Sequence, residues 1–231
     1  MNIETKRKLN AMNMQDIAES IEAQEVNPAF YAQLSFEERL SSLIDDIYQK
    51  RHNEKIQRRI KQAKLRYPSA SIADVDYVSR KLDKGLLNEL GTMNFLSSST
   101  NIVIQGFTGS GKTYLSCAIA KEACKKDIKT FTIRLPEMLQ KRAEEKILHR
   151  ENISLSEDDI RFLYELFELR YGKSSTIFVG QYPTTEWHTR LGGGAHADSI
   201  LDRIVHNIII IESGSINMRE LLDSKKYKHQ I

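Results

Sequence analysis

The sequence lacks a run of about 20 apolar residues, which is the length that a membrane-spanning helix needs. Its opening segment, MNIETKRKLN, also lacks the apolar core of a secretory signal. Cysteine is nearly absent, and the two that occur, Cys117 and Cys124, lie in a stretch with the pattern of a helix. We therefore expect neither disulfides nor a metal cluster, and we interpret both cysteines as small core residues. These absences predict a cytoplasmic protein with no membrane partner.

Proline is also scarce, and no large excess of one charge is present. The 231 residues include four prolines and carry a net charge of +3, with 28% charged and 40% apolar residues. This composition argues against extensive disorder and supplies enough apolar side chains for a packed core. The length suits one domain of ordinary size with a smaller appendage.

The N-terminal part carries helical signals. Residues 1–34 have apolar side chains at roughly helical spacing and predict one or two short helices. The segment SFEE predicts a capping box in which Ser35 and Glu38 cap the start of a long helix. We expect this helix to end at Tyr67-Pro68, because proline disfavours a helical conformation in the residue before it.

The second half of that long helix is strongly cationic. From Lys50 to Arg66 the sequence has eight lysines and arginines against one glutamate. Pairing between positions i and i+4 cannot balance such an excess, and charge of this kind usually has an anionic partner. We expect DNA as that partner, with a solvated surface helix or an acidic protein as the alternatives. The expected DNA-binding residues are the eight cations Lys50, Arg51, Lys55, Arg58, Arg59, Lys61, Lys64 and Arg66.

The segment GFTGSGKT, residues 106–113, has the G-x-x-x-x-G-K-[ST] pattern of a phosphate-binding loop. The apolar run NIVIQ precedes it and the helical stretch TYLSCAIAKEACKK overlaps its end, which gives the strand, loop and helix that phosphate binding needs. We expect Lys112 to reach the β- and γ-phosphates of ATP and Thr113 to ligate Mg²⁺. A glycine-rich turn without a ligand is the alternative. The expected nucleotide-binding residues are Gly106, Phe107, Thr108, Gly109, Ser110, Gly111, Lys112, Thr113 and Tyr114.

The remaining elements alternate between strand and helix. A helix begins near Pro136, and further helices cover 158–171 and 197–205, whereas strands are predicted at 101–105, 130–134, 174–180 and 207–212. Such alternation predicts a parallel sheet between layers of helices, so we expect an α/β P-loop fold with three layers. The domain organisation that follows is a helical N-terminal module over residues 1–66 and a nucleotide domain over residues 67–231.

Several segments together resemble the IstB/DnaC-like AAA+ ATPases, ATP-binding helper proteins that are encoded beside transposases in insertion sequences. LSFEERL and the cationic helix after it resemble the N-terminal module of that family, GFTGSGKTYLSCAIA its Walker A segment, and SSTIFVGQYPTTEWHTRL its sensor 1 strand and loop. ADSILDRIVHNIIIIESGSINMR is similar to its C-terminal block. The resemblance implies an AAA+ type P-loop fold, ATP and Mg²⁺ as cofactors, a homo-oligomer assembled on DNA, and a transposase as partner.

The resemblance also implies roles for single residues. Gln181 stands where the family has a polar sensor 1 residue, although by itself it is only a glutamine at the end of a strand. Arg203 corresponds to the arginine that acts in trans as an arginine finger, whereas an isolated helical arginine is more often a surface residue. Arg219 corresponds to the sensor 2 arginine that contacts the nucleotide, with Asn217 in place of the usual serine.

The Walker B strand of such ATPases, a short apolar run that ends in two acids, is not visible in the sequence. It should lie between the helix at Pro136 and the helix at 158, where the sequence includes KRAEEKILHRENISLSEDD. A further strand with its connecting helix needs on the order of 20–30 residues, so we expect an internal shortening near 146–155. We also expect a weakened sheet, because we place the Walker B strand beside the phosphate-loop strand. Candidate substitutes for the missing acids are Glu151 and, in the next helix, Glu157, Asp158 and Asp159.

These observations predict an IstB-like ATP-binding helper protein that binds DNA and ATP to assist a transposase. The family implies ATPase activity, but the absence of paired acids predicts ATP binding without efficient hydrolysis. Two alternatives stay open, a DnaC-like replicative helicase loader and a non-catalytic DNA-binding remnant. A small-molecule P-loop kinase is disfavoured, because no lid or substrate-acid motif is present. The catalytic candidates are Lys112, Gln181, Arg203 and Glu151.

Overall fold

The computed structural model describes residues 1–145, 155–214, 216–218 and 220–221. The chain forms two compact units, Met1–Arg58 and Arg59–Ile231. The division between them falls inside a long helix, ahead of residue 66, where the domain boundary was expected. Within the described ranges, no helix combines the length and the apolar character needed to cross a membrane.

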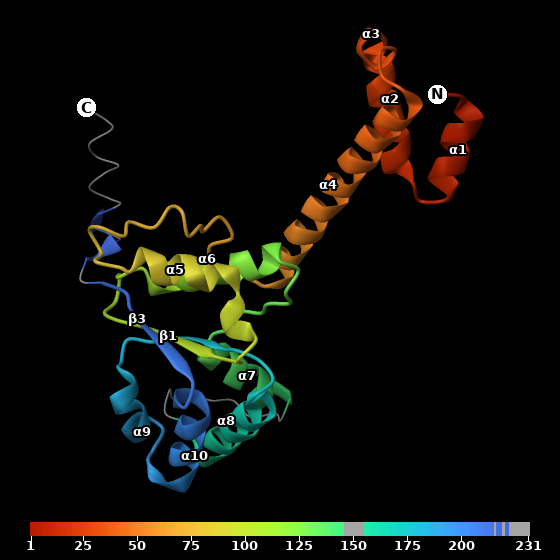
Figure 1. The fold of residues 1–231 in the computed structure, drawn as a ribbon. Helices are drawn as coiled ribbons and strands as arrows, with labels where there is room; N and C mark the ends of the chain where they lie inside the picture. Colours follow the sequence, from red (N-terminus) through yellow and green to blue (C-terminus); the bar gives the residue numbers. More distant parts are fainter. Residues whose placement is uncertain (146–154, 215, 219, 222–231) are drawn as a thin grey trace. The chain divides into compact units, whose positions relative to one another are not determined.

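The first unit consists of helices. They are α1 Ile3–Ala11, α2 Gln15–Val26, α3 Pro28–Tyr31 and α4 Phe36–Gln62, whose last turn belongs to the second unit (Figure 1). The capping box that begins α4 is confirmed. The Ser35 N–H donates to the Glu38 carboxylate at 2.7 Å, and the Glu38 N–H donates to the Ser35 hydroxyl at 3.2 Å. Two donors that a helix start leaves without helical acceptors are thereby satisfied.

The end of α4 differs from the expectation based on Pro68. The helix stops at Gln62, several residues before the proline. Lys64 has a φ of 52°, in the left-handed region, and its N–H bonds to the carbonyl of Lys61 at 3.3 Å in a tightened last turn. A left-handed residue ends a helix by itself. The predicted end at Tyr67-Pro68 is therefore wrong.

The second unit contains a three-stranded sheet in which every pairing is parallel. Its strands are β1 Asn101–Gln105, β2 Ile177–Val179 and β3 Ile208–Glu212, in the order β2-β1-β3. Ile104 of β1 lies opposite Val179 of β2 and Ile211 of β3. The central residues of β1 have 0% exposure, as expected for a parallel strand covered on both faces. The strands predicted at 101–105, within 174–180 and within 207–212 are thus confirmed.

Helices cover both faces of this sheet, so the three-layer α/β architecture is confirmed (Figure 1). The helical elements of the second unit are α5 Lys84–Thr92, η1 Asn94–Leu96, α6 Lys112–Lys125, α7 Leu135–Glu145, α8 Glu157–Arg170, η2 Thr184–Glu186, α9 Trp187–Arg190 and α10 Gly194–Val205. Helices α5 and α6 lie on one face and α8 and α10 on the other. Cys117 and Cys124 of α6 are buried and free, which confirms them as small core residues. The face that α8 and α10 cover is filled by a cluster made of Ile160, Leu163, Ile200 and Ile204, with Phe178 of β2 packed against it.

The strand predicted at 130–134 is wrong. These residues form no strand, and the Phe131 side chain is 58% exposed. The Thr132 N–H donates instead to the carbonyl of Ala63, just after α4, at 2.9 Å. These residues do not pair with the sheet, although the outer edges of β2 and β3 carry no further strand among the described residues. Local preference for extended backbone was therefore not sufficient to add 130–134 to the sheet.

The expected weakness beside the phosphate-loop strand is wrong as well. Strand β1 precedes the loop, and it is paired along both of its edges. No position next to β1 is left for a Walker B strand, so the absence of such a strand does not open the sheet at the loop. Residues 146–154, on which the internal shortening was expected, lie outside the described ranges.

Replacing Ser156 with alanine should destabilise the second unit, because the capping box of α8 would be lost. The Ser156 hydroxyl accepts the Asp159 N–H at 3.3 Å, and the Asp159 carboxylate accepts the Ser156 N–H at 2.9 Å. We expect the free energy of unfolding, measured by urea denaturation, to fall by about 1 kcal/mol. Ser199→Ala within α10 is the control, because the Ser199 hydroxyl makes no hydrogen bond to a described residue. Equal urea midpoints for the two variants would contradict a stabilising role for the cap.

Candidate functional site

The candidate site is the loop that joins β1 to α6. Gly106, Gly109 and Gly111 have φ values of 140°, 90° and 85°, a region that side chains with a Cβ rarely adopt. Space is equally restricted there. A Cβ at Gly106 would collide with the Ser213 hydroxyl, and one at Gly109 would collide with the Asn217 side chain. Both the backbone conformation and the close approach of other segments therefore require glycine.

The start of α6 presents backbone donors without acceptors. Gly111 is the N-cap residue and no side chain caps the helix. The first helical bond runs from the Leu115 N–H to the Gly111 carbonyl at 3.1 Å, so the amides of the three residues before Leu115 have no helical acceptor. These amides and the positive end of the helix dipole form an anion-binding site.

Lys112 lies over this loop. Its ammonium donates to the carbonyls of Gly106 at 2.7 Å and Phe107 at 2.6 Å, and burial lowers its pKa. The next residue, Thr113, has a hydroxyl without a hydrogen-bond partner among the described residues. A phosphate chain at the α6 amides would offer the Lys112 ammonium better acceptors than neutral carbonyls. The residues present therefore fit a nucleotide phosphate chain, with Thr113 as the residue that would hold a Mg²⁺ ion.

The other predicted loop residues have different surroundings. Phe107 and Thr108 are exposed. Ser110 is 0% exposed, and its hydroxyl bonds to the Phe107 carbonyl and to the Ser213 hydroxyl. The Tyr114 hydroxyl accepts the Ser71 N–H at 3.3 Å. The side chains of Ser110 and Tyr114 thus hold the loop and helix against neighbouring segments. The Ser110 N–H is also bonded, to the Phe107 carbonyl at 3.3 Å, so of these two residues only Tyr114 offers a backbone amide to a phosphate.

A buried arginine behind the loop was missed by the sequence analysis. Arg80 is 2% exposed, and its guanidinium donates to the carbonyls of Ser110 at 2.7 Å and Ser213 at 2.9 and 3.3 Å. Burial lowers the pKa of Arg80, while the nearby Asp76 acts in the opposite direction. Arg80 belongs to no quoted motif, and Ser213 lies in the C-terminal block without an assigned role. Only long-range contacts bring them to the loop, so the sequence did not point to them.

Gln181, the predicted sensor 1 residue, and Arg203, the predicted arginine finger, lie at different ends of the sheet. Gln181 follows β2 directly, and β2 pairs with β1, so Gln181 lies at the same carboxyl end as the loop. Arg203 lines a pocket at the amino ends of the strands, formed in part by Asn101, Thr176 and Asn207. The fold therefore brings Gln181, but not Arg203, to the phosphate loop of its own chain.

Arg203 is held by its own chain. Its guanidinium forms an ion pair with Glu168, donates to the Ser199 carbonyl at 2.9 Å, and lies 5.1 Å from the centre of the Tyr164 ring. The hydrogen bond with Glu168 raises the pKa of Arg203. A contact of Arg203 with a nucleotide in another subunit would have to replace the Glu168 pair.

Two candidates cannot be placed, and one of the possible substitute acids has a structural role. Glu151 and Arg219 lie outside the described ranges. Asp159 belongs to the capping box of α8 and also lies 3.5 Å from Arg142, so its carboxylate is committed to the start of the helix. In the described part of the chain, no group of three or more His, Cys, Asp or Glu residues is arranged to hold a metal ion.

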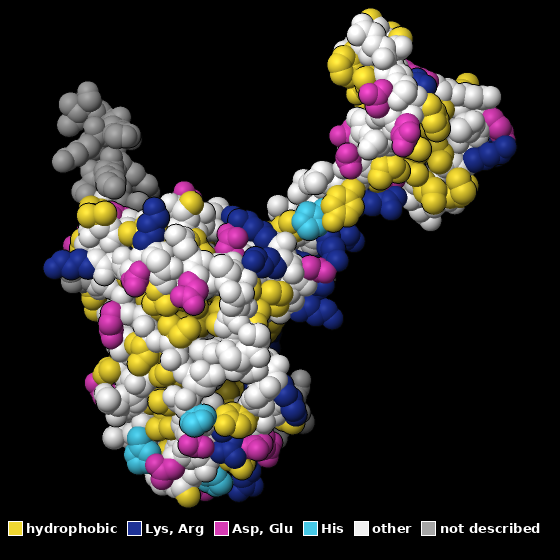
Figure 2. Space-filling model, in the orientation of Figure 1, with side chains coloured by type: hydrophobic (Ala, Val, Ile, Leu, Met, Phe, Trp, Pro, Cys, Tyr) yellow, Lys and Arg dark blue, Asp and Glu magenta, His cyan; other side chains and the backbone are white. Residues whose placement is uncertain are grey.

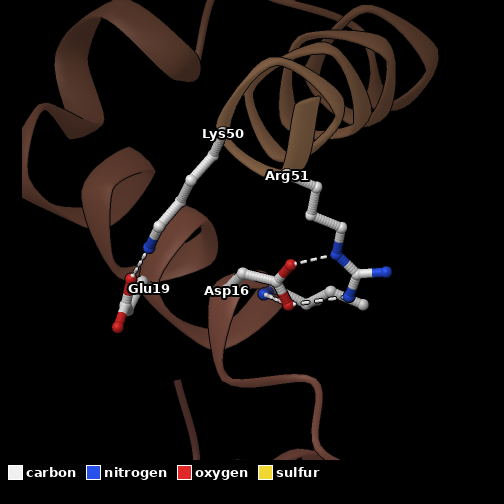
Figure 3. Close-up of polar contacts among 5 residues, drawn as sticks. Asp16, Glu19, Lys50 and Arg51 are labelled. Carbon is white, nitrogen blue, oxygen red and sulfur yellow. Dashed lines mark hydrogen bonds and ion pairs between the residues drawn. The ribbon is translucent and has the colours of Figure 1, made fainter. Parts of the chain in front are cut away.

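Some of the expected DNA-binding cations are paired with acids. In the first unit, Lys50 forms an ion pair with Glu19 and Arg51 forms one with Asp16, both acids being on α2 (Figure 3). The hydrogen bonds with Arg51 lower the pKa of Asp16. In the second unit, Arg59 lies 2.9 Å from Asp127. These pairs neutralise part of the positive charge that the sequence displays.

The remaining cations are more available. Arg58 and Lys61 are exposed and form no ion pair with a described residue. Lys64 and Arg66 are also exposed, and each lies over an aromatic ring, at 5.5 Å from the centre of Phe131 and 5.7 Å from that of Tyr67. Figure 2 shows cationic side chains gathered along the later part of α4. Lys55 has a polar interaction of its own.

The sequence matches the family model described as "IstB-like ATP binding protein" over residues 7–152 and 151–226. Two related proteins come from Sinorhizobium fredii (strain NBRC 101917 / NGR234). The insertion sequence ATP-binding protein y4pL is 31% identical over 235 residues, which cover 93% of this chain and 95% of the relative. The insertion sequence ATP-binding protein y4uH is 30% identical over 207 residues, which cover 81% of this chain and 84% of the relative.

One solved structure supports the same fold. A primosome component from Streptococcus pyogenes serotype M3 has a TM-score of 0.52 and 17% sequence identity, over 71% of this chain and 97% of that chain. The parallel sheet, the phosphate loop and this likeness agree on a P-loop fold of the AAA+ type. The family model accounts for most of the sequence, and both relatives reach 30% identity over most of their length. This chain therefore belongs to the family of IstB-like ATP-binding proteins.

Proposed function

We propose that this chain is the ATP-binding helper of an insertion-sequence transposase, which holds ATP with Mg²⁺ at the loop and contacts DNA through α4. The observation that carries the nucleotide part is the loop itself, where glycines at positive φ, free amides and Lys112 converge at the start of α6. The context of transposition comes from the relatives, which are insertion sequence ATP-binding proteins. The partners that follow are DNA, the transposase of the same element and further copies of this chain.

In this proposal Lys112 and the amides of α6 bind the phosphates, and Gln181 approaches them from the end of β2. Arg203 would serve a neighbouring subunit, because its position at the amino ends of the strands keeps it from the loop of its own chain. Without a neighbouring subunit, Arg203 would stay paired with Glu168.

Lys112→Ala should weaken ATP binding, because the charged donor to the phosphates is removed while the loop backbone is kept. We expect the affinity, measured by calorimetric titration, to fall roughly 10- to 100-fold. Lys121→Ala is the matched control, since Lys121 lies on the same helix and its ammonium donates to the Ser69 carbonyl at 3.2 Å. Undiminished ATP binding by a folded Lys112→Ala variant would refute the assignment of the loop.

The DNA contact is proposed for the cations of α4 and the residues after it that keep their charge available. Arg58 and Lys61 are three positions apart on one helix, so their side chains lie on the same face. Lys64 and Arg66 continue the cationic stretch. Paired cations such as Lys50 and Arg51 would contribute less, because binding a phosphate requires that their ion pairs with α2 be broken.

The double variant Arg58→Ala/Lys61→Ala should bind duplex DNA more weakly. Each phosphate contact that is lost lowers the dependence of log affinity on log salt by about 1, so we expect that slope to fall by about 2. Fluorescence anisotropy over a salt series measures both quantities. The control is Lys50→Ala/Arg51→Ala. It also removes two positive charges, but both of these are paired with acids. Equal losses of slope in the two double variants would contradict the assignment to Arg58 and Lys61.

We further propose that the chain lacks the block that carries the Walker B acids and therefore holds ATP with little turnover. Two observations support an internal shortening. The family model matches in two segments that meet at residues 151 and 152. The alignment with y4pL extends over 235 residues, more than the whole chain has, although it covers only 93% of the chain. The relative therefore has positions without a counterpart here.

Phosphate release from ATP should stay near the rate of the Lys112→Ala variant, both with and without duplex DNA. The reason is that water activation in such sites depends on acids that a separate strand supplies. A steady-state phosphate assay on the full chain measures this rate, and a parallel ATP titration establishes that the site is filled. Release that DNA stimulates well above the rate of Lys112→Ala would overturn this part of the proposal.

A further inference from the structure

The peptide between Ser110 and Gly111 is fixed from behind the loop. The Ser110 carbonyl accepts a hydrogen bond from the Arg80 guanidinium at 2.7 Å. The described residues contain no cis peptide, and in a planar trans peptide the C=O and the following N–H point in opposite directions. Because Arg80 occupies the carbonyl side, the Gly111 N–H is directed away from Arg80.

That Gly111 N–H has no acceptor in the described part of the protein. Gly111 itself is partly exposed, whereas Arg80 behind it is buried. A backbone donor of this kind is normally paired with protein or with a ligand. The unpaired donor immediately precedes the free amides of α6, which extends the anion-binding group by one residue.

Arg80 also joins the loop to the segment that follows β3. Its Nη2 donates to both the Ser110 and the Ser213 carbonyls, and its Nε donates to Ser213 as well. The Ser110 and Ser213 hydroxyls bond to each other, and Ser213 follows β3 with its N–H on the Gln105 carbonyl. A guanidinium has the planar, multiple donors that such a bridge needs, and a lysine ammonium would not reproduce it.

The limited space at two glycines near Arg80 indicates that Arg80 is closely packed. A Cβ on Gly111 would lie 3.1 Å from the Arg80 Nη2, and a Cβ on Gly214 would lie 2.5 Å from the Arg80 carbonyl oxygen. The guanidinium therefore leaves little room for a side chain at Gly111. A cation bound to the peptide carbonyl also polarises the peptide, which makes its N–H a stronger donor.

We propose that Arg80 is a positioning residue of the phosphate loop, which holds the Ser110–Gly111 peptide so that the Gly111 N–H donates to a phosphate of bound ATP. Arg80 acts through this peptide and does not touch the nucleotide. The inference rests on the proposed function, because it requires that a nucleotide binds at the loop. It assigns a role in phosphate recognition to a segment that precedes β1 in the sequence.

The test compares Arg80→Met and Arg80→Lys with the unchanged chain. We expect the ATP affinity of Arg80→Met to fall roughly 10- to 100-fold, as for loss of one hydrogen bond to a charged group. Arg80→Lys should bind ATP with an intermediate affinity, because it keeps the charge but loses the planar set of donors. Arg170→Met is the control, since Arg170 donates to the Ser175 carbonyl and the Thr176 hydroxyl at the other end of the sheet. Folded Arg80→Met and Arg80→Lys variants that bind ATP like the unchanged chain would overturn the inference.

The first step of a second measurement uses the unchanged chain and needs no variant. In the unchanged chain, labelled with ¹⁵N at its 11 glycines, the Gly111 amide proton should shift downfield when ATP is added. In Arg80→Lys this shift should become smaller at saturating ATP, which a general loss of stability would not cause. A Gly111 signal that does not move while the unchanged chain binds ATP would overturn the inference alone. Absence of ATP binding by the unchanged chain would overturn the proposed function and the inference together.

Discussion

The nucleotide site depends on the position of β1. This strand is buried on both faces and paired on both edges, so the position of its carboxyl end is fixed. The loop leaves from that end, and α6 begins immediately after it, covered by the same core. Burial of the strand therefore determines where the amides of α6 lie and in which direction they point. The segment after β3 reinforces this arrangement, because Ser213 bonds to Gln105 and Ser110 from the neighbouring strand.

The parts of the fold that follow from local patterns were predictable from the sequence. The strand before the loop, the glycines and α6 follow one another directly, and Ser35 and Glu38 cap α4 three residues apart. The errors concern features that distant residues decide. Residues 130–134 have the composition of a strand, but the Thr132 N–H bonds to the carbonyl of Ala63 and not to a strand. Arg80 was not identified from the sequence, because its role depends on Ser110 and on Ser213, which is distant in the sequence.

The cations of residues 50–66 likewise could not be interpreted from the sequence alone. The sequence displays eight cations in one stretch, yet the structure divides them by their partners. Lys50 and Arg51 face acids of α2, whereas Arg58 and Lys61 do not form such pairs with described residues (Figure 3). Exposed ion pairs of this kind contribute little to stability, but they change what a cation can offer to a phosphate backbone. A DNA-binding helix is therefore better defined by its unpaired cations than by its net charge.

Binding and hydrolysis of a nucleotide depend on different parts of this fold. In the proposed function, backbone amides and Lys112 bind the phosphates at the start of α6, and Arg80 and Ser213 support the loop from behind without touching the nucleotide. The acids that activate water in related sites come from a separate strand. Since β2 and β3 already occupy both edges of β1, loss of that further strand leaves the phosphate loop supported. Under the proposed shortening, the chain would keep a well-formed site for ATP without the acids that cleave it, and the bound nucleotide would stabilise the second unit by mass action.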